Sequence, residues 1–149
     1  MKTKRTLPPT YLLISIATMS LLHFLAPVSV VISYPWTLLG AVPLIAGAIF
    51  NLLADSALKR AQTTVKPFEK STELITTGVF QISRHPMYLG MTLILIGLAV
   101  FMGTITPLII IVVFALLMEV VFVRVEEKML EQQFGSGWIA YKKKVRKWL

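Results

Sequence analysis

The sequence predicts an all-α integral membrane protein of one domain, residues 1–149, with about four transmembrane helices and cytoplasmic helices at the C-terminal end. Two observations carry this prediction. Hydrophobic residues make up 56% of the chain and charged residues only 15%, whereas soluble domains have about 45–50% and about 25%. The charged residues also gather in three stretches separated by long charge-free runs, a pattern typical of membrane-spanning chains.

The first charge-free stretch predicts a transmembrane hairpin. Residues 6–54 contain no Asp, Glu, Lys or Arg, which is too long for one span of about 20 residues. An aromatic and proline break at residues 34–36 marks the turn, because Tyr and Trp favour the membrane interface. We therefore expect spans over residues 11–33 and 36–54, with Pro27 kinking the first. The apolar run is too long for a cleaved signal peptide.

The second charge-free stretch predicts another hairpin. Residues 85–118 lack Asp, Glu, Lys and Arg, and a single helix of that length would be about 50 Å long. A Gly and Pro turn at residues 103–107 divides the stretch into spans over residues 87–102 and 107–123. The first of these is short, so it should be tilted or covered by its neighbours.

The distribution of basic residues predicts the orientation. All fifteen Lys and Arg residues lie in the N-terminal segment, in the connection over residues 55–86 or in the C-terminal tail, and both short turns have none. The positive-inside rule then places both termini in the cytoplasm. This topology accounts for the net charge of +8 without a nucleic-acid partner. The sequence does not indicate an oligomeric state.

The part of the domain after the first hairpin, residues 55–149, contains the predicted cytoplasmic helices. Residues 55–62 should extend the second span as a helix. A helix after the last span should reach about Gln133, where Gly135 favours a stop. A second helix carries five apolar residues among basic ones, and we interpret it as an amphipathic helix on the membrane surface: Trp138, Ile139, Tyr141, Val145 and Trp148.

Two polar residues lie inside the predicted spans, His23 and Asn51. We expect His23 to make a polar contact between helices, and Asn51 to make an interhelical hydrogen bond or a cap. The chain has no cysteine and only two histidines, with no spacing typical of metal ligands, so we predict no metal site.

A polar corner precedes the third span. Arg84 and His85 come directly before Pro86, which suits the first turn of a helix because its missing N–H is no loss there. The start of a helix also presents free N–H groups that attract anions. The corner is therefore either part of a binding site or a helix start whose arginine reaches lipid headgroups.

A second polar group follows the fourth span. Glu119 lies within the predicted fourth span, and a carboxylate inside a membrane span suggests a functional role. Glu119 and Glu126 are seven positions apart, so they should share one face of a helix, with Glu127 about 100° away. The alternative interpretation is a solvated charged helix leaving the membrane, which explains Glu126 and Glu127 better than Glu119.

Taken together, the stretches GVFQISRHPMYLG (residues 78–90) and EEKMLEQQFG (residues 126–135) resemble motifs of the isoprenylcysteine carboxyl methyltransferase family. That family belongs to a wider group of small membrane methyltransferases, which includes phospholipid N-methyltransferases. The resemblance covers roughly residues 60–149, and the first two spans are similar only in hydropathy.

The resemblance implies methyl transfer from S-adenosylmethionine to a lipophilic acceptor at the cytoplasmic membrane face. The acceptor would be a prenylcysteine carboxylate, a lipid or a thiol. Carried over motif by motif, it implies catalytic roles for Arg84 and Glu127. It implies cofactor binding by seven further residues: Gly78, His85, Pro86, Tyr88, Gly90, Glu126 and Tyr141.

Two other functions stay open at this point. A membrane sterol-reductase relative would use NADPH and has a similar pattern in its C-terminal half, although such proteins are much larger. A non-enzymatic four-span membrane subunit would use Arg84 and the glutamates for topology alone.

Overall fold

The structure, a computed structural model, describes residues 7–63 and 71–149. In these ranges the ordered elements are helices, joined by turns and one isolated bridge between two extended residues. The elements are α1 (Pro8–Leu25), η1 (Trp36–Gly40), α2 (Ala41–Arg60), η2 (Gly78–Gln81), α3 (Pro86–Met102), α4 (Thr106–Met118), η3 (Glu119–Val123), α5 (Arg124–Phe134) and α6 (Ser136–Lys144). The all-helical prediction is confirmed.

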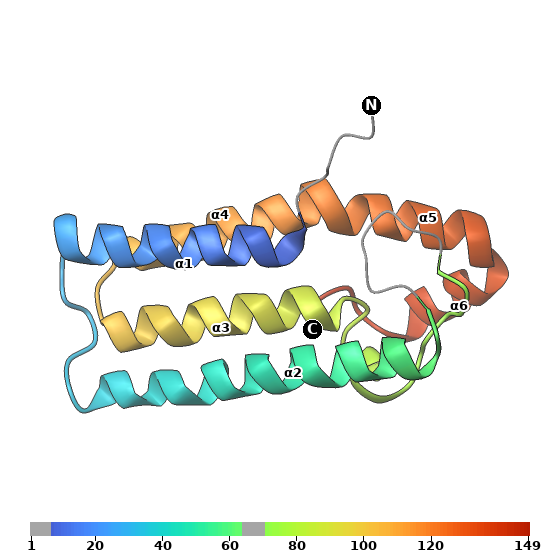
Figure 1. The fold of residues 1–149 in the computed structure, drawn as a ribbon, viewed down its shortest axis with the longest axis horizontal. Helices are drawn as coiled ribbons and strands as arrows, with labels where there is room; N and C mark the ends of the chain where they lie inside the picture. The colour runs from blue at the N-terminus through green and yellow to red at the C-terminus, as the bar shows by residue number, and fades with distance from the viewer. Residues whose placement is uncertain (1–6, 64–70) are drawn as a thin grey trace.

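Four long helices lie side by side as an antiparallel bundle (Figure 1). The connections α1–α2 and α3–α4 meet at one end of the bundle, and η2, α5 and α6 lie at the other end. Within the described ranges, three helical stretches are long and apolar enough to cross a membrane: Pro8–Leu25, Trp36–Arg60 and Thr106–Phe134. The chain is therefore built as a membrane protein, while the count of four spans stays a prediction.

The short helix α3 lies in the middle of the bundle and packs against α1, α2 and α4. Its buried side chains include Tyr88, Met91 and Leu95. In contrast, the outer face of α2 exposes large apolar side chains such as Ile45 and Leu52. Exposed apolar surface of this kind is stable against lipid rather than water. The short span is thus covered by its neighbours, as predicted.

Helices α2 and α3 approach closely along a row of glycines. A Cβ atom on Gly47 would lie 2.4 Å from the carbonyl oxygen of Gly90, and one on Gly97 would lie 2.6 Å from that of Gly40. Small residues at such positions let two membrane helices make backbone contact. The side chain of Asn51 donates to the Gly47 carbonyl one turn back in its own helix, at 3.0 Å. This hydrogen bond lies within α2, whereas the prediction was an interhelical hydrogen bond or a cap.

The sequence prediction placed the end of the first span, at residue 33, too far along the chain. Helix α1 stops at Leu25, and Pro27 lies beyond the helix instead of kinking it. The reason is steric, because a proline disfavours the α conformation of the residue before it. Ala26 accordingly has φ −140° and ψ 59°.

The residues after α1 run extended over the α3–α4 turn. The N–H of Val31 donates to the Gly103 carbonyl at 2.8 Å, and the N–H of Ile105 donates to the Ser29 carbonyl at 3.2 Å. Gly103 has φ +68°, and a Cβ there would lie 2.3 Å from the Ile32 carbonyl oxygen, so only glycine fits. Close by, His23 Nδ1 lies 2.9 Å from Thr104 Oγ1. His23 thus makes a polar contact, but its partner lies in the α3–α4 turn and not in a neighbouring helix as predicted.

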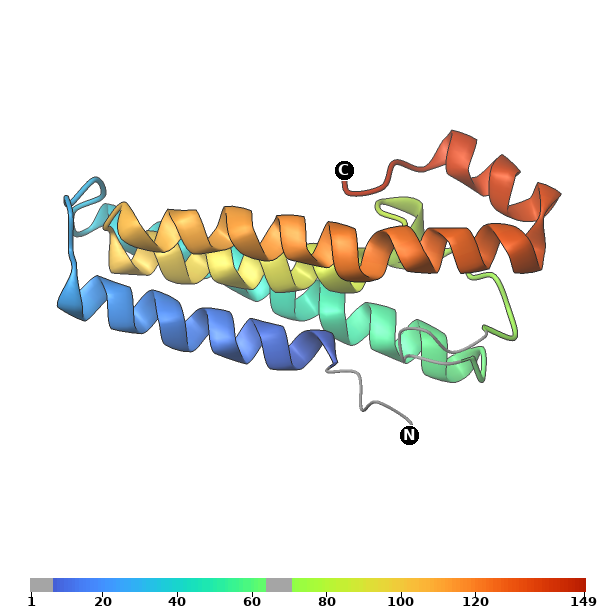
Figure 2. The same cartoon turned by 90° about the horizontal axis from the view of Figure 1, so that it is seen from above.

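The last long helix runs without interruption from α4 through η3 into α5 (Figure 2). It ends at Phe134, and Gly135 with φ +49° reverses the chain into α6, so the predicted stop is confirmed. Helix α6 ends at Lys144, and Trp138 and Tyr141 on it are buried. These two aromatic residues therefore face the protein, contrary to the interpretation of this helix as a membrane-surface helix.

Candidate active site

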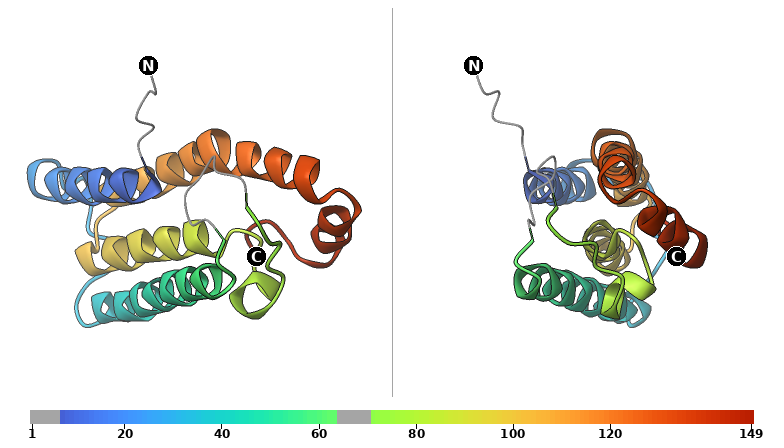
Figure 3. Two further views of the ribbon diagram at one scale, coloured as in Figure 1. Left: turned by 45° about the vertical axis from the view of Figure 1, so that its right-hand side comes forward. Right: turned by 90° about the vertical axis from the view of Figure 1, so that its right-hand side faces the viewer.

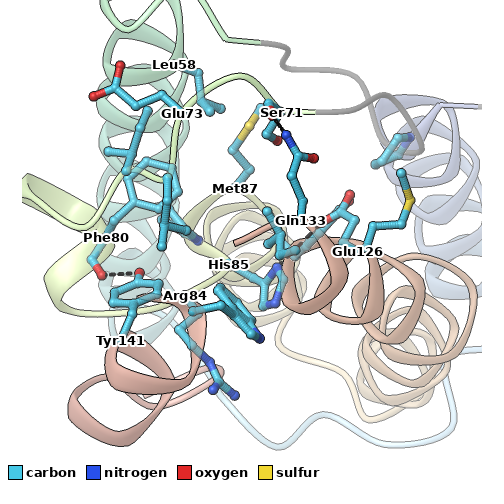
Figure 4. A pocket seen from close by; sticks show the side chains of 18 of the residues that line it. Leu58, Ser71, Glu73, Phe80, Arg84, His85, Met87, Glu126, Gln133 and Tyr141 are labelled. Carbon is cyan, nitrogen blue, oxygen red and sulfur yellow. Dashed lines mark hydrogen bonds and ion pairs between the residues drawn. The ribbon is translucent and has the colours of Figure 1, made fainter. Parts of the chain in front are cut away.

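A cavity of about 270 Å³ lies at the end of the bundle where α5 and α6 meet the start of α3. Figure 3 shows how α5, α6 and η2 surround this end. The walls come from the first turn of α1, the segment before α3, the first turns of α3, one face of α5, and α6. Segments far apart in the sequence thus build one site (Figure 4).

The polar corner is part of this wall. Pro86 occupies the first position of α3, as predicted. The N–H of His85 donates to Ser83 Oγ at 3.1 Å, which provides a partner for a buried backbone donor just before the helix. Arg84, His85 and Pro86 all line the cavity.

His85 lies between two carboxylates of α5. Its Nδ1 is 3.5 Å from Glu126 Oε2, and its Nε2 is 3.5 Å from Glu127 Oε1. Burial alone would lower the pKa of His85, but the negative charges of Glu126 and Glu127 outweigh it and raise the pKa above its usual range. The two carboxylates therefore favour the protonated form of the imidazole.

Glu126 lines the cavity, as does Glu73 of the segment before α3. Glu126 Oε1 accepts a hydrogen bond from the Tyr88 hydroxyl group, which lies on the first turn of α3. Both residues line the cavity. Glu126 therefore joins the two predicted motifs directly, because one end of its carboxylate contacts Tyr88 and the other approaches His85.

Arg84 forms a buried ion pair with Glu127. Its Nη2 lies 2.8 Å from Glu127 Oε1, and its guanidinium carbon is 5.6 Å from the centre of the Trp138 ring, a cation–π contact. Figure 4 shows the guanidinium group pointing away from the centre of the cavity. Arg84 is only 8% exposed, so it does not reach for headgroups. Glu127 is not among the residues that line the cavity.

The predicted shared face of Glu119 and Glu126 is wrong. Residues 119–123 form a π-helical turn, which inserts one extra residue into the helix. The insertion rotates all that follows, so Glu127 replaces Glu126 on the face of Glu119. Lys147 contacts both, with Nζ 2.8 Å from Glu119 Oε1 and 3.6 Å from Glu127 Oε2.

Aromatic side chains form another wall. The Tyr141 hydroxyl group donates to the Phe80 carbonyl oxygen, and burial raises the pKa of Tyr141 to about 12, so this donor persists at neutral pH. Trp138 is 1% exposed, and its ring contacts Tyr141 with centroids 5.6 Å apart. Its Nε1 is buried with no hydrogen-bond partner among the described residues.

Most of the predicted site residues meet here, but three of them do not line the cavity: Gly78, Gly90 and Glu127. Gly78 lies in an exposed turn with φ +62°, and Gly90 is part of the glycine row against α2. The sequence prediction missed several lining residues: Phe80, Met87, Met129, Leu130, Gln133 and Trp138. A helical period would have found three of these, because residues 126, 129, 130 and 133 share one face of α5.

The fold and the site define a small helical membrane protein. Its site lies at one end of the bundle and is lined by both polar and apolar side chains. A comparison with known families then gives the particular relationship. The sequence model of the phospholipid methyltransferase family matches residues 35–137, and the chain belongs to this family. The predicted membership in the phospholipid and isoprenylcysteine group of membrane methyltransferases is thereby confirmed. Comparisons with curated proteins and with solved structures found no match.

Proposed function

We propose that the protein transfers a methyl group from S-adenosylmethionine to a lipophilic acceptor at the cytoplasmic face of a membrane. The observation that carries this proposal is the composition of the cavity wall. It combines an acidic residue, buried nitrogen donors and aromatic rings with a wall of apolar side chains.

The wall residues fit the chemical groups of S-adenosylmethionine. The buried Nε1 of Trp138, a residue of the cavity wall, has no hydrogen-bond partner among the described residues, and such a donor suits the carboxylate of the cofactor. Glu126 can accept hydrogen bonds from ribose hydroxyl groups or an amino group. The rings of Tyr88 and Tyr141 suit a sulfonium cation.

When bound, the cofactor supplies an electrophilic methyl group on a positively charged sulfur. The residues of the chain then have to align the acceptor and exclude water. If the acceptor is an amine or a thiol, Glu126 accepts its proton, since this carboxylate faces the cavity. A carboxylate acceptor needs no base. We assign Arg84 and Glu127 to holding His85 and Trp138 in place.

The apolar part of the wall supports a lipophilic acceptor. Leu7 and Pro8 at the start of α1, together with Met87, Met91 and Met129, line one side of the cavity. Thioether side chains are adaptable and accommodate irregular apolar groups. The family match supports a lipid-type substrate.

Titration calorimetry of the detergent-purified protein with S-adenosylhomocysteine tests the proposal. Glu126→Gln should weaken binding by about tenfold to a hundredfold, since hydrogen bonds to a charged group contribute about 1.5–3 kcal/mol. Lys143→Met, on the exposed side of α6, is the matched control and should bind as the native chain does. Binding of NADPH in place of S-adenosylhomocysteine, or of neither, would contradict the proposal.

A further inference from the structure

The chain beyond α6 returns to the polar corner. The N–H of Arg84 donates to the Arg146 carbonyl at 3.1 Å, and Ser83 Oγ donates to the Lys147 carbonyl at 3.0 Å. Trp148 then packs against the buried hydrophobic cluster of the bundle. Figure 1 shows this chain end close to the start of α3. The matched family region ends at residue 137, so the terminal segment that accepts these hydrogen bonds lies outside it.

The side chain of Lys147 connects this terminal segment to the long helix. It contacts Glu119 Oε1 at 2.8 Å and Glu127 Oε2 at 3.6 Å. Two carboxylates eight positions apart would not align on a regular α-helix, where eight residues rotate by about 800°. The π-helical turn over residues 119–123 brings them into line.

Glu127 therefore has three positively charged neighbours. Its Oε1 is 2.8 Å from Arg84 Nη2 and 3.5 Å from His85 Nε2, and its Oε2 faces Lys147. Removing the Lys147 side chain would leave Glu119 and Glu127 without the cation that they share. The position of His85 in the cavity wall depends on these same contacts.

We propose that Lys147 is a positioning residue that fixes Glu127, and through it Arg84 and His85, in the arrangement that binds the cofactor. The inference rests on the proposed function for its role in cofactor binding. The charge coupling from Lys147 to His85 does not depend on that function, so it has a readout of its own.

The experiment compares Lys147→Met and Lys147→Arg with the control Lys143→Met. S-adenosylhomocysteine should bind Lys147→Met about tenfold more weakly than the native chain, and Lys147→Arg should regain most of the affinity because it keeps the cation. Lys143→Met should match the native chain.

The second readout is the proton equilibrium of His85, measured by NMR in a His23→Gln background so that one imidazole remains. The groups around His85 are Glu126, Glu127, Arg84 and Tyr88. With Lys147→Met, Glu127 is less neutralised and holds the imidazolium more strongly, so the pKa of His85 should rise above that of the native chain. Lys147→Arg should leave it near the native value.

Equal affinity and equal His85 titration in Lys147→Met and Lys143→Met would overturn the inference. If Lys147→Met does not fold, Glu119→Gln replaces it, since it removes the closer of the two carboxylates that hold the Lys147 side chain beside Glu127. That variant should lose several-fold affinity, and unchanged binding would again overturn the inference. If the native chain binds no S-adenosylhomocysteine while His85 responds to Lys147→Met, the proposed function fails and the positioning of His85 stands.

Discussion

At His85, burial and charge act on one proton in opposite directions. The side chain is 5% exposed, which would normally expel the charge, yet two glutamates lie at 3.5 Å on either side of the ring. The carboxylates prevail, and the pKa of His85 is raised. The folded protein thus binds this proton more tightly than the unfolded chain does.

A pH dependence of stability follows from this binding. The stabilisation is fully present below the unfolded pKa of about 6.5 and is lost as the pH rises through the higher folded value. The melting temperature of the detergent-solubilised protein should therefore fall as the pH rises from about 6.5 through the higher pKa of the folded state. Thermal unfolding followed by circular dichroism measures it.

Two variants separate His85 from other groups that titrate in this range. His85→Gln should flatten the dependence, while His23→Gln should retain it, because His23 contacts a threonine at the far end of the bundle. An equal slope in the native chain and in His85→Gln would show that the proton of His85 does not contribute.

Local sequence identified the polar residues of the site but not their partners. Arg84, His85, Tyr88 and Glu126 stand in recognisable motifs, and the structure brings them together. The contacts of Lys147 join segments that are distant in sequence, so no local sequence pattern predicts them. The π-helical turn also has no clear signature in an apolar run, which is why the face of Glu119 was predicted incorrectly.

At the scale of the helices, the glycine row between α2 and α3 positions the first turn of α3 and hence the polar corner. Gly47→Val should destabilise the protein by about 1–3 kcal/mol or more, because the added atoms meet backbone rather than a flexible side chain. The measurement is thermal unfolding in detergent, with S-adenosylhomocysteine affinity as a second readout.

Gly137→Ala is the matched control for this substitution. Nothing lies within 4 Å of a Cβ placed on Gly137, and alanine is favoured over glycine inside a helix such as α6. This variant should be as stable as the native chain or slightly more stable. Unfolding of Gly47→Val at the native temperature would show that α2 and α3 can separate without cost.

Helix existence was predictable because long apolar runs have few alternatives in a membrane. The α3–α4 turn and the stop at Gly135 were also located correctly, since glycine and proline act locally. The end of α1 was not, because residues 26–33 are mostly apolar and the sequence prediction treated Pro27 as a kink within the span instead of the end of the helix. Tertiary hydrogen bonds to Gly103 and Ser29 hold these residues extended instead.

At the scale of the whole molecule, the bundle places both hairpin connections at one end and the cavity at the other. The chain has no cysteine, so an introduced cysteine is its only thiol. Labelling of that thiol reports the side of the membrane on which the residue lies. In intact cells, a membrane-impermeant thiol reagent should label Ser33→Cys in the first connection and leave Lys143→Cys on α6 unlabelled. After permeabilisation both should react.

Labelling of Lys143→Cys in intact cells, without labelling of Ser33→Cys, would reverse the predicted orientation. Labelling of both would mean that the two ends of the bundle are accessible from one side, which contradicts the predicted spanning topology. Thr37→Cys, also near the first connection, provides a repeat of the outer position.

The uninterrupted helix over Thr106–Phe134 enters the membrane at one end and carries Glu126 into the cavity wall at the other. A helix without a break tilts as one unit. Its inclination changes when the bilayer is thicker or thinner than the apolar part of the helix. Any such change displaces Glu126 relative to Tyr88 on the neighbouring α3. We therefore expect the length of the lipid chains to influence the geometry of the site.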